Sequence, residues 1–163
     1  MRRLAVLLVL GLVAVPAVPL VWAGLHVVRS ASSYPGGWIS DHLGPRATVA
    51  AGGLLFALVA VALGSRLSPA GAVTAFLLLG PVAGLTESAE RALVAGLAPV
   101  RTGRGFGIYH ALIGASALPA GLAFGLLYQR VGGPAALLGS AAGILVAVAA
   151  WIAIMTANAT RNR

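Results

Sequence analysis

Long apolar runs dominate this chain of 163 residues and constrain its fold more than any other feature. Apolar residues make up 60% of the sequence, charged residues make up only 9%, and the mean hydropathy is +0.98. A soluble domain carries about a quarter charged residues, so this chain has too few to cover a surface that faces water. The sequence therefore predicts an integral membrane protein with the lipid bilayer as its partner.

Five stretches are long enough to cross a bilayer as helices, which needs about 20 apolar residues each. No segment alternates with period two as the strands of a membrane barrel do, and the connections are short and contain Gly, Pro or Arg. The sequence thus predicts an all-α bundle of five transmembrane helices. The predicted spans are 4–33 (overlong), 47–63, 70–97, 105–128 and 135–156, and the predicted connections are 36–46, 65–69, 98–104 and 129–134.

The N-terminal segment allows three interpretations. Two early arginines precede a short apolar core, as in a signal peptide, but the apolar sequence continues without a polar mature start. Pro16 and Pro19 favour a break between a leader and a full helix over 19–35. A short sixth helix is the third alternative. The predicted organisation is a leader or remnant helix over 1–17, a transmembrane bundle over 18–157 and a cytoplasmic tail over 158–163.

Arginines in short loops predict the orientation in the membrane. Five fall on one side and two on the other, which places the C-terminus in the cytoplasm of a multi-pass inner-membrane protein. Five spans would put the N-terminus outside, against its own arginines, and a short sixth helix would remove this conflict. The five are Arg46, Arg101, Arg104, Arg161 and Arg163, and the two are Arg66 and Arg130.

Composition and motifs exclude several classes of function. The arginines stand singly or in pairs at the edges of apolar runs, so the net charge of +8 does not predict nucleic-acid binding. The chain has no cysteine, and His26, His42 and His110 lack the spacing of metal ligands. No nucleophile elbow, H-E-x-x-H or phosphate-binding loop occurs, so no enzyme activity, cofactor or metal is predicted.

Glycine pairs four residues apart predict close contact between helices. Small residues at this spacing let helix backbones approach inside lipid, which favours a packed bundle over separate anchors. The pairs are Gly80/Gly84, Gly103/Gly107, Gly121/Gly125 and Gly139/Gly143.

A glycine-rich connection carries a family resemblance. The segment 37–46 resembles the signature cytoplasmic loop of major facilitator superfamily (MFS) transporters, although His42 and Pro45 stand where the family usually has basic residues. The glycines permit a tight turn, and the acid can pair with an arginine or a helix N-terminus across the gate. The residues that match the motif are Gly37, Asp41, Gly44 and Arg46.

A second stretch repeats this frame with glutamine in place of the acid. The copies lie three spans apart, which fits the nested inverted repeats of an MFS half, while chance similarity of two glycine-rich loops is the alternative. The second copy comprises Gly125, Gln129, Arg130 and Gly132.

The resemblance covers residues 18–151 and is most specific over 84–99 and 103–120, which are similar to the tenth and eleventh helices of a bacterial subgroup. It implies a truncated C-terminal half, helices eight to twelve of a twelve-helix protein. Such transporters rock two halves around a midplane site, so activity would need a second copy or the missing N-terminal half. The expected function is transport of an unknown small solute. The alternative is a non-transporting membrane protein that acts as an assembly or interaction partner.

Ionisable residues inside the predicted spans form a polar layer. At about 1.5 Å per residue, they lie roughly 9 to 15 Å from the predicted cytoplasmic ends. Charges inside a bilayer are costly and often functional. Three interpretations stay open: structural ion pairs, a cavity that binds solute or a coupling proton, and snorkelling to the interface. The layer comprises Arg29, Glu87, Glu90, Arg91 and His110, with His26 nearer the midplane.

Overall fold

The computed structural model of the chain describes residues 17–65 and 67–161. These residues form helices joined by short turns, and no strand occurs among them, which confirms the predicted all-α class. The helices are α2 (Val18–Leu43), α3 (Pro45–Gly64), α4 (Pro69–Leu77), α5 (Leu79–Leu97), α6 (Thr102–Val131) and α7 (Gly133–Arg161).

Four helical stretches are long and apolar enough to cross a membrane: α3, α4 with α5, α6 and α7. They confirm that the chain has the character of a helical membrane protein. Helix α2 is not among the four, and its 26 residues include Arg29, Asp41 and two histidines. The count of five spans therefore stays a prediction. The leader over 1–17 and a short sixth helix fall almost entirely outside the described residues.

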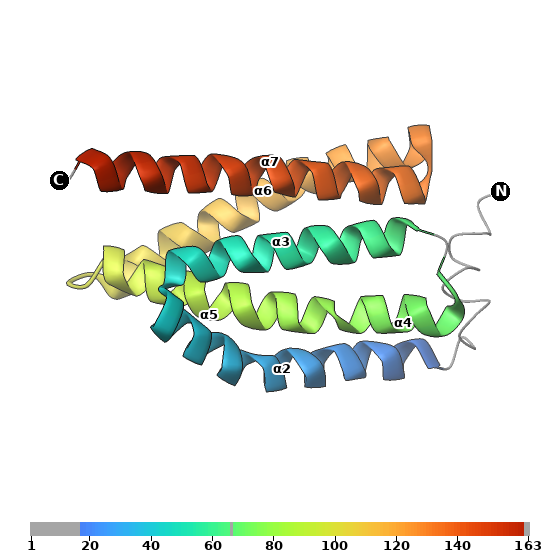
Figure 1. The fold of residues 1–163 in the computed structure, drawn as a ribbon, viewed down its shortest axis with the longest axis horizontal. Helices are drawn as coiled ribbons and strands as arrows, with labels where there is room; N and C mark the ends of the chain where they lie inside the picture. The colour runs from blue at the N-terminus through green and yellow to red at the C-terminus, as the bar shows by residue number, and fades with distance from the viewer. Residues whose placement is uncertain (1–16, 66, 162–163) are drawn as a thin grey trace.

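Helix α2 runs further than the sequence predicted. It continues through Pro35 to Leu43, so the predicted helix end at 35 and the predicted loop over 36–46 are wrong. The chain reverses at Gly44 alone, where φ is +85°, a conformation that glycine adopts easily. Pro45 then begins α3 at a position where no backbone N–H is needed. Figure 1 shows α2 curving along its length, as a proline inside a helix causes.

A similar one-residue turn joins α6 to α7. Gly132 has φ +85°, and its N–H donates to the carbonyl of Tyr128 at 3.0 Å. Gly133 begins α7 directly after it, with Pro134 in the first turn. The predicted connection over 129–134 therefore shrinks to a single glycine. The two turns at the ends of the repeated frame are alike in backbone conformation, and they lie at opposite ends of the bundle (Figure 1).

Helices α4 and α5 form one bent stretch that corresponds to the predicted span over 70–97. Pro81 has no N–H to donate to the carbonyl of Leu77, and its ring crowds that carbonyl. The helix is interrupted at Leu78, which keeps a helical backbone and hydrogen bonds to Thr74 at 3.0 Å. The interruption is therefore local, and α4 and α5 continue as one stretch over Pro69–Leu97.

The bundle has an extensively packed part and a loosely attached helix. Helix α2 packs chiefly against α5, and α3 packs against α5 and α7, whereas α6 crosses obliquely from the end of α5 to the start of α7 (Figure 1). Small side chains fill the core because the helices lie close together. The buried apolar residues are Ala50, Ala57, Val59, Ala60, Ala75, Val82, Ala89, Ala136, Ala141 and Val148.

The connections lie at two opposite ends of the bundle. The turn at Gly44, the turn over 98–101 and the C-terminal end of α7 lie at one end (Figure 1). The turn between α3 and α4 and the turn at Gly132 lie at the other. Arg66 and Arg163 are outside the described residues. The end that holds Arg46 and Arg101 is the one that the sequence predicts to be cytoplasmic.

Candidate functional site

Glycines bring the backbones of α2 and α5 into contact, and this contact positions the site. A Cβ placed on Gly84 would lie 2.7 Å from the carbonyl carbon of Ser32, and one on Gly80 would lie 2.9 Å from the backbone nitrogen of Arg29. Gly36 likewise faces the carbonyl of Gly84 with no room for a side chain. The Gly80/Gly84 pair therefore works as predicted, because only glycine allows this approach.

A serine reinforces the same crossing. The hydroxyl of Ser88 lies 2.9 Å from the carbonyl of Gly84 and 3.2 Å from the carbonyl of Ser33 across the interface. A hydroxyl that bonds to a neighbouring helix stabilises helix association inside lipid, where water offers no competing partner. The two helices are thus held by backbone proximity and by a polar contact.

Three charged side chains meet beside Ser88. Arg29 of α2 forms an ion pair with one carboxylate oxygen of Glu87, and the Nη2 atom of Arg91 lies 3.8 Å from the other. Glu87 is 31% exposed, Arg29 is 41% exposed and Arg91 is 71% exposed. The closer partner of Glu87 is therefore an arginine from another helix, and the i,i+4 partner is the looser one.

The longer course of α2 changes the predicted depth of Arg29. Leu43 follows Arg29 by fourteen positions, so Arg29 lies about 21 Å from that helix end at 1.5 Å per residue, and the predicted range of roughly 9 to 15 Å is wrong for this residue. Glu87 lies about 15 Å from the end of α5 by the same rise. The ion pair is thus well inside the helices and away from their ends.

The second acid of α5 has a different partner. The hydroxyl of Tyr109 on α6 donates to a carboxylate oxygen of Glu90. Glu90 belongs to neither ion pair found among the described residues. Tyr109 was not among the predicted site residues, although a tyrosine next to His110 at the depth of the acids is a detectable signal. We call Arg29, Glu87, Glu90, Arg91 and Tyr109 the polar cluster.

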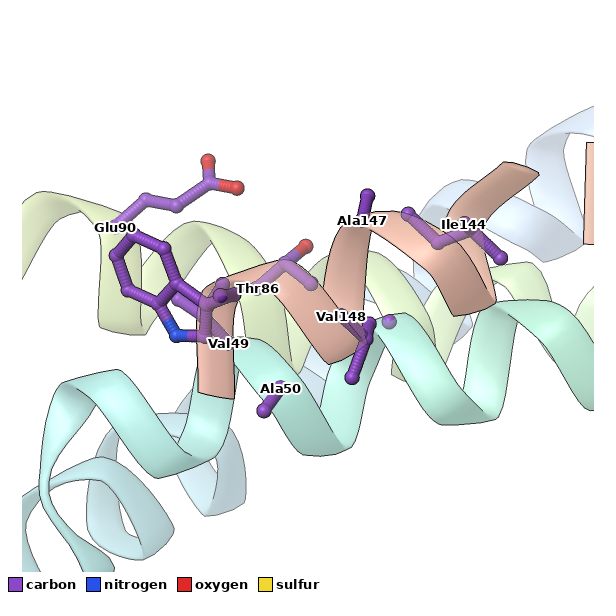
Figure 2. Close-up of a pocket in the computed structure, with 9 residues that line it drawn as sticks. Val49, Ala50, Thr86, Glu90, Ile144, Ala147 and Val148 are labelled. Carbon is purple, nitrogen blue, oxygen red and sulfur yellow. The ribbon is translucent and has the colours of Figure 1, made fainter. Parts of the chain in front are cut away.

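Glu90 also lines a groove between α3, α5 and α7, which has a volume of about 250 Å³ (Figure 2). Glu90 is the single ionisable residue of its lining. The sequence pattern within a single helix does not predict this groove, because its lining comes from three helices and two of them, α3 and α7, are far apart in sequence. The lining residues are Val49, Ala50, Gly53, Thr86, Glu90, Ile144, Ala147, Val148 and Trp151.

The three histidines form no ion pair with an acid among the described residues. His110 is exposed, and its ring lies 5.0 Å from the ring of Tyr109 and 6.5 Å from that of Phe106. His26 lies beside Trp22, with 5.5 Å between the ring centres. Within the described ranges, no three side chains of His, Asp or Glu gather as metal ligands would.

The first motif lies on a helix and not in a loop. Gly37 and Asp41 belong to the last turns of α2, and Asp41 is exposed without an ion pair in the part of the chain that the structure describes. Gly44 makes the turn. Arg46 has an exposed side chain, while its carbonyl accepts a hydrogen bond of 3.1 Å from the indole of Trp151. The motif residues therefore lie at or before the turn, but the acid pairs with no arginine among residues 17–65 and 67–161.

The second copy follows the same plan at the other end. Gly125, Gln129 and Arg130 lie in the last turns of α6, and both polar side chains are exposed. Gly132 makes the turn. Each copy therefore ends a long helix with a glycine of positive φ, and a polar residue precedes that glycine by three positions.

Comparison with known proteins gave no match to a family model, a curated protein or a solved structure. The polar cluster, the groove and the sequence motifs are therefore the features from which a function can be inferred.

Proposed function

We propose that this protein is a membrane transporter of the major facilitator type, in which the polar cluster lines the path of a small solute or of a proton. The supporting observation is a set of partly exposed charges near the middle of α2 and α5. Glu87 and Arg29 keep about a third of their side-chain surface or more uncovered. Charges at that depth require water or a protein partner, because lipid tails solvate neither the carboxylate nor the guanidinium group.

Alternating access requires a second bundle. Transporters of this type move two bundles around a central site, and the helices described here form one. Helix α6 has no buried residue along its 30 residues and carries Tyr109 of the polar cluster. A second copy or another polypeptide segment placed beside α6 would close a cavity over the cluster. The proposed location is the inner membrane, with the C-terminus in the cytoplasm.

The uncovered α6 also supports a second candidate, a membrane protein that assists assembly and transports nothing. A 30-residue helix without buried side chains is available for contact with a partner. This candidate gives no role to the charges inside the helices. The transporter proposal gives a role to both features, and we therefore prefer it.

Reconstitution in liposomes tests the proposal. The full chain is inserted into the liposome membrane, alone or together with a candidate partner bundle. The liposomes enclose a pH-sensitive dye, and small solutes are added outside. We expect one class of solute to drive proton movement, and Glu87→Gln to abolish it while the protein stays folded. If no solute changes the dye signal beyond that of protein-free liposomes, and the protein forms a stable complex with a partner, the assembly role is favoured.

A further inference from the structure

The groove between α3, α5 and α7 has a polar end and an apolar end. Glu90 lies at one end, and Ile144 lies at the other with Gly53 beside it, since a Cβ on Gly53 would lie 3.8 Å from the Ile144 side chain. Trp151 follows Ile144 by seven positions, which places it about 10 Å further along α7 at 1.5 Å per residue, toward the side of Glu90. Figure 2 shows Glu90 on α5 at one side of the group and Ile144 at the opposite side. A ligand that fits this shape has a polar head and an apolar tail.

The charge of the polar end is a carboxylate that no arginine of the cluster compensates. Arg29 and Arg91 pair with Glu87, and the described partner of Glu90 is the neutral hydroxyl of Tyr109. A carboxylate accepts several hydrogen bonds, so Glu90 can accept from Tyr109 and from a ligand together. A group that carries positive charge and donates hydrogen bonds complements it.

The rest of the lining selects against other head groups. None of the nine lining residues is basic, so a phosphate or carboxylate head would meet Glu90 without a compensating charge. The indole of Trp151 is an aromatic surface of the kind that attracts organic cations. The volume of about 250 Å³ is below the range of drug-sized ligand pockets, which favours a small single-chain molecule over a phospholipid.

We propose that this groove binds a single-chain amphiphilic ammonium ion that enters from the bilayer. The ammonium group bonds to the carboxylate of Glu90 beside the indole of Trp151. The alkyl chain lies along α7 over Val148 and Ile144. Ala147 is exposed at the rim, so the tail reaches the groove from the lipid side. The binding needs no transport, and its failure would leave the transporter proposal untouched.

Calorimetry on the full chain in phosphatidylcholine nanodiscs tests this site with octylammonium as the probe. Its amine is protonated at neutral pH, since alkyl amines such as lysine titrate near pH 10.4. Octanol has the same tail without the charge. We expect octylammonium to bind saturably and octanol to bind at least about tenfold more weakly, because it leaves the charge of Glu90 unpaired.

Two variants and one matched control locate the site. Glu90→Gln keeps the shape and can still accept from Tyr109, and it should weaken octylammonium binding by about tenfold or more. Ala147→Phe fills the groove and should abolish binding. Ala149→Phe places the same ring on an exposed position of α7 outside the lining and should leave binding unchanged.

Three outcomes would overturn the proposal. Equal affinity for octanol and octylammonium would show an apolar hollow without recognition of charge. Unchanged binding in Glu90→Gln would assign the carboxylate another role, such as carrying a proton. Absence of octylammonium binding, combined with stabilisation by phosphatidylethanolamine nanodiscs that Ala147→Phe removes, would assign the groove to a lipid head group.

Discussion

Helices α5 and α6 are consecutive in the chain and comparable in apolar character, yet one is packed and the other is not. In α5, Gly80 and Gly84 lie against the backbone of α2 at distances that exclude any side chain. In α6, Gly107, Gly114 and Gly121 have nothing within 4 Å of where a Cβ would be. The same residue type therefore creates a contact in one helix and leaves an open surface in the other.

The polar groups divide in the same way. Glu87 of α5 is paired across helices with Arg29, and Ser88 bonds to the backbone of α2. On α6, Tyr109 alone reaches α5 through a side-chain hydrogen bond among the described residues, and His110 is exposed. Glycine spacing and intramembrane charge thus indicate that a helix is built to pack, but they do not identify its partner.

Glycine substitution should show the largest difference in stability between α5 and α6. Gly84→Leu drives a side chain into the backbone of Ser32, where nothing flexible can yield, and should lower stability by about 3 kcal/mol or prevent folding. Gly121→Leu on α6 meets open space and should change stability by less than about 0.5 kcal/mol. Thermal unfolding in detergent measures both. Equal destabilisation would mean that α6 is packed as tightly as α5.

The two turn glycines sharpen the comparison next. Gly44 and Gly132 share φ +85° with extended ψ, a region that other residues rarely adopt, so each change to alanine should cost about 1 to 3 kcal/mol. The loss should be larger for Gly44→Ala, because both helices that it joins are held by the packed core, whereas α6 can shift. Chemical unfolding of the two variants side by side measures the difference. A larger loss for Gly132→Ala would contradict the loose attachment of α6.

A double-mutant cycle tests the ion pair that joins α2 to α5. Arg29→Gln and Glu87→Gln should each lower stability by about 1 kcal/mol, because each leaves one charge stranded among apolar side chains, and partial exposure limits the loss. The double variant should recover part of this loss. Arg91→Gln should cost less than about 0.5 kcal/mol, since its side chain is 71% exposed. Strictly additive losses would show that Arg29 and Glu87 do not interact.

The sequence was informative about elements and less so about partners. Hydropathy located α3, the bent α4–α5 stretch, α6 and α7 within a few residues, because the bilayer fixes the length and composition of a spanning helix. It ended α2 too early, since a proline followed by two glycines is typical of a turn. Here Pro35 is accommodated and Gly36 packs against Gly84, a contact that depends on the tertiary structure.

The candidate site was predictable in its acids and arginines and not in its arrangement. Structural ion pairs were one predicted interpretation, and Glu87 and Arg91 stand four residues apart on α5. The nearer cation is nevertheless Arg29, because the parallel crossing of α2 and α5 brings it there. Glu90 and Trp151 share a groove only because α3 packs against α7. Such pairings between distant segments leave no periodic signal in a single sequence.

The smallest expected effect concerns the bond that attaches α6 to α5. Tyr109→Phe removes the hydroxyl that donates to Glu90 and should lower global stability by no more than about 1 kcal/mol. The local effect should be clearer, because α6 has few other contacts to hold it. Hydrogen exchange should quicken for amides of α6 and stay unchanged in α2 and α5, since weakly packed elements open independently of the core.

His110→Phe is the control, because it changes an exposed neighbouring ring that bonds to no acid among the described residues, and exchange should then stay as in the native chain. If Tyr109→Phe quickens exchange equally in α2, α5 and α6, the helices unfold as one cooperative unit, and the contrast between the packed pair and the loosely attached helix fails. If exchange rises in α6 alone, the Tyr109–Glu90 bond is what holds α6 over the polar cluster, and a partner bundle that docks beside α6 would compete with or replace that bond.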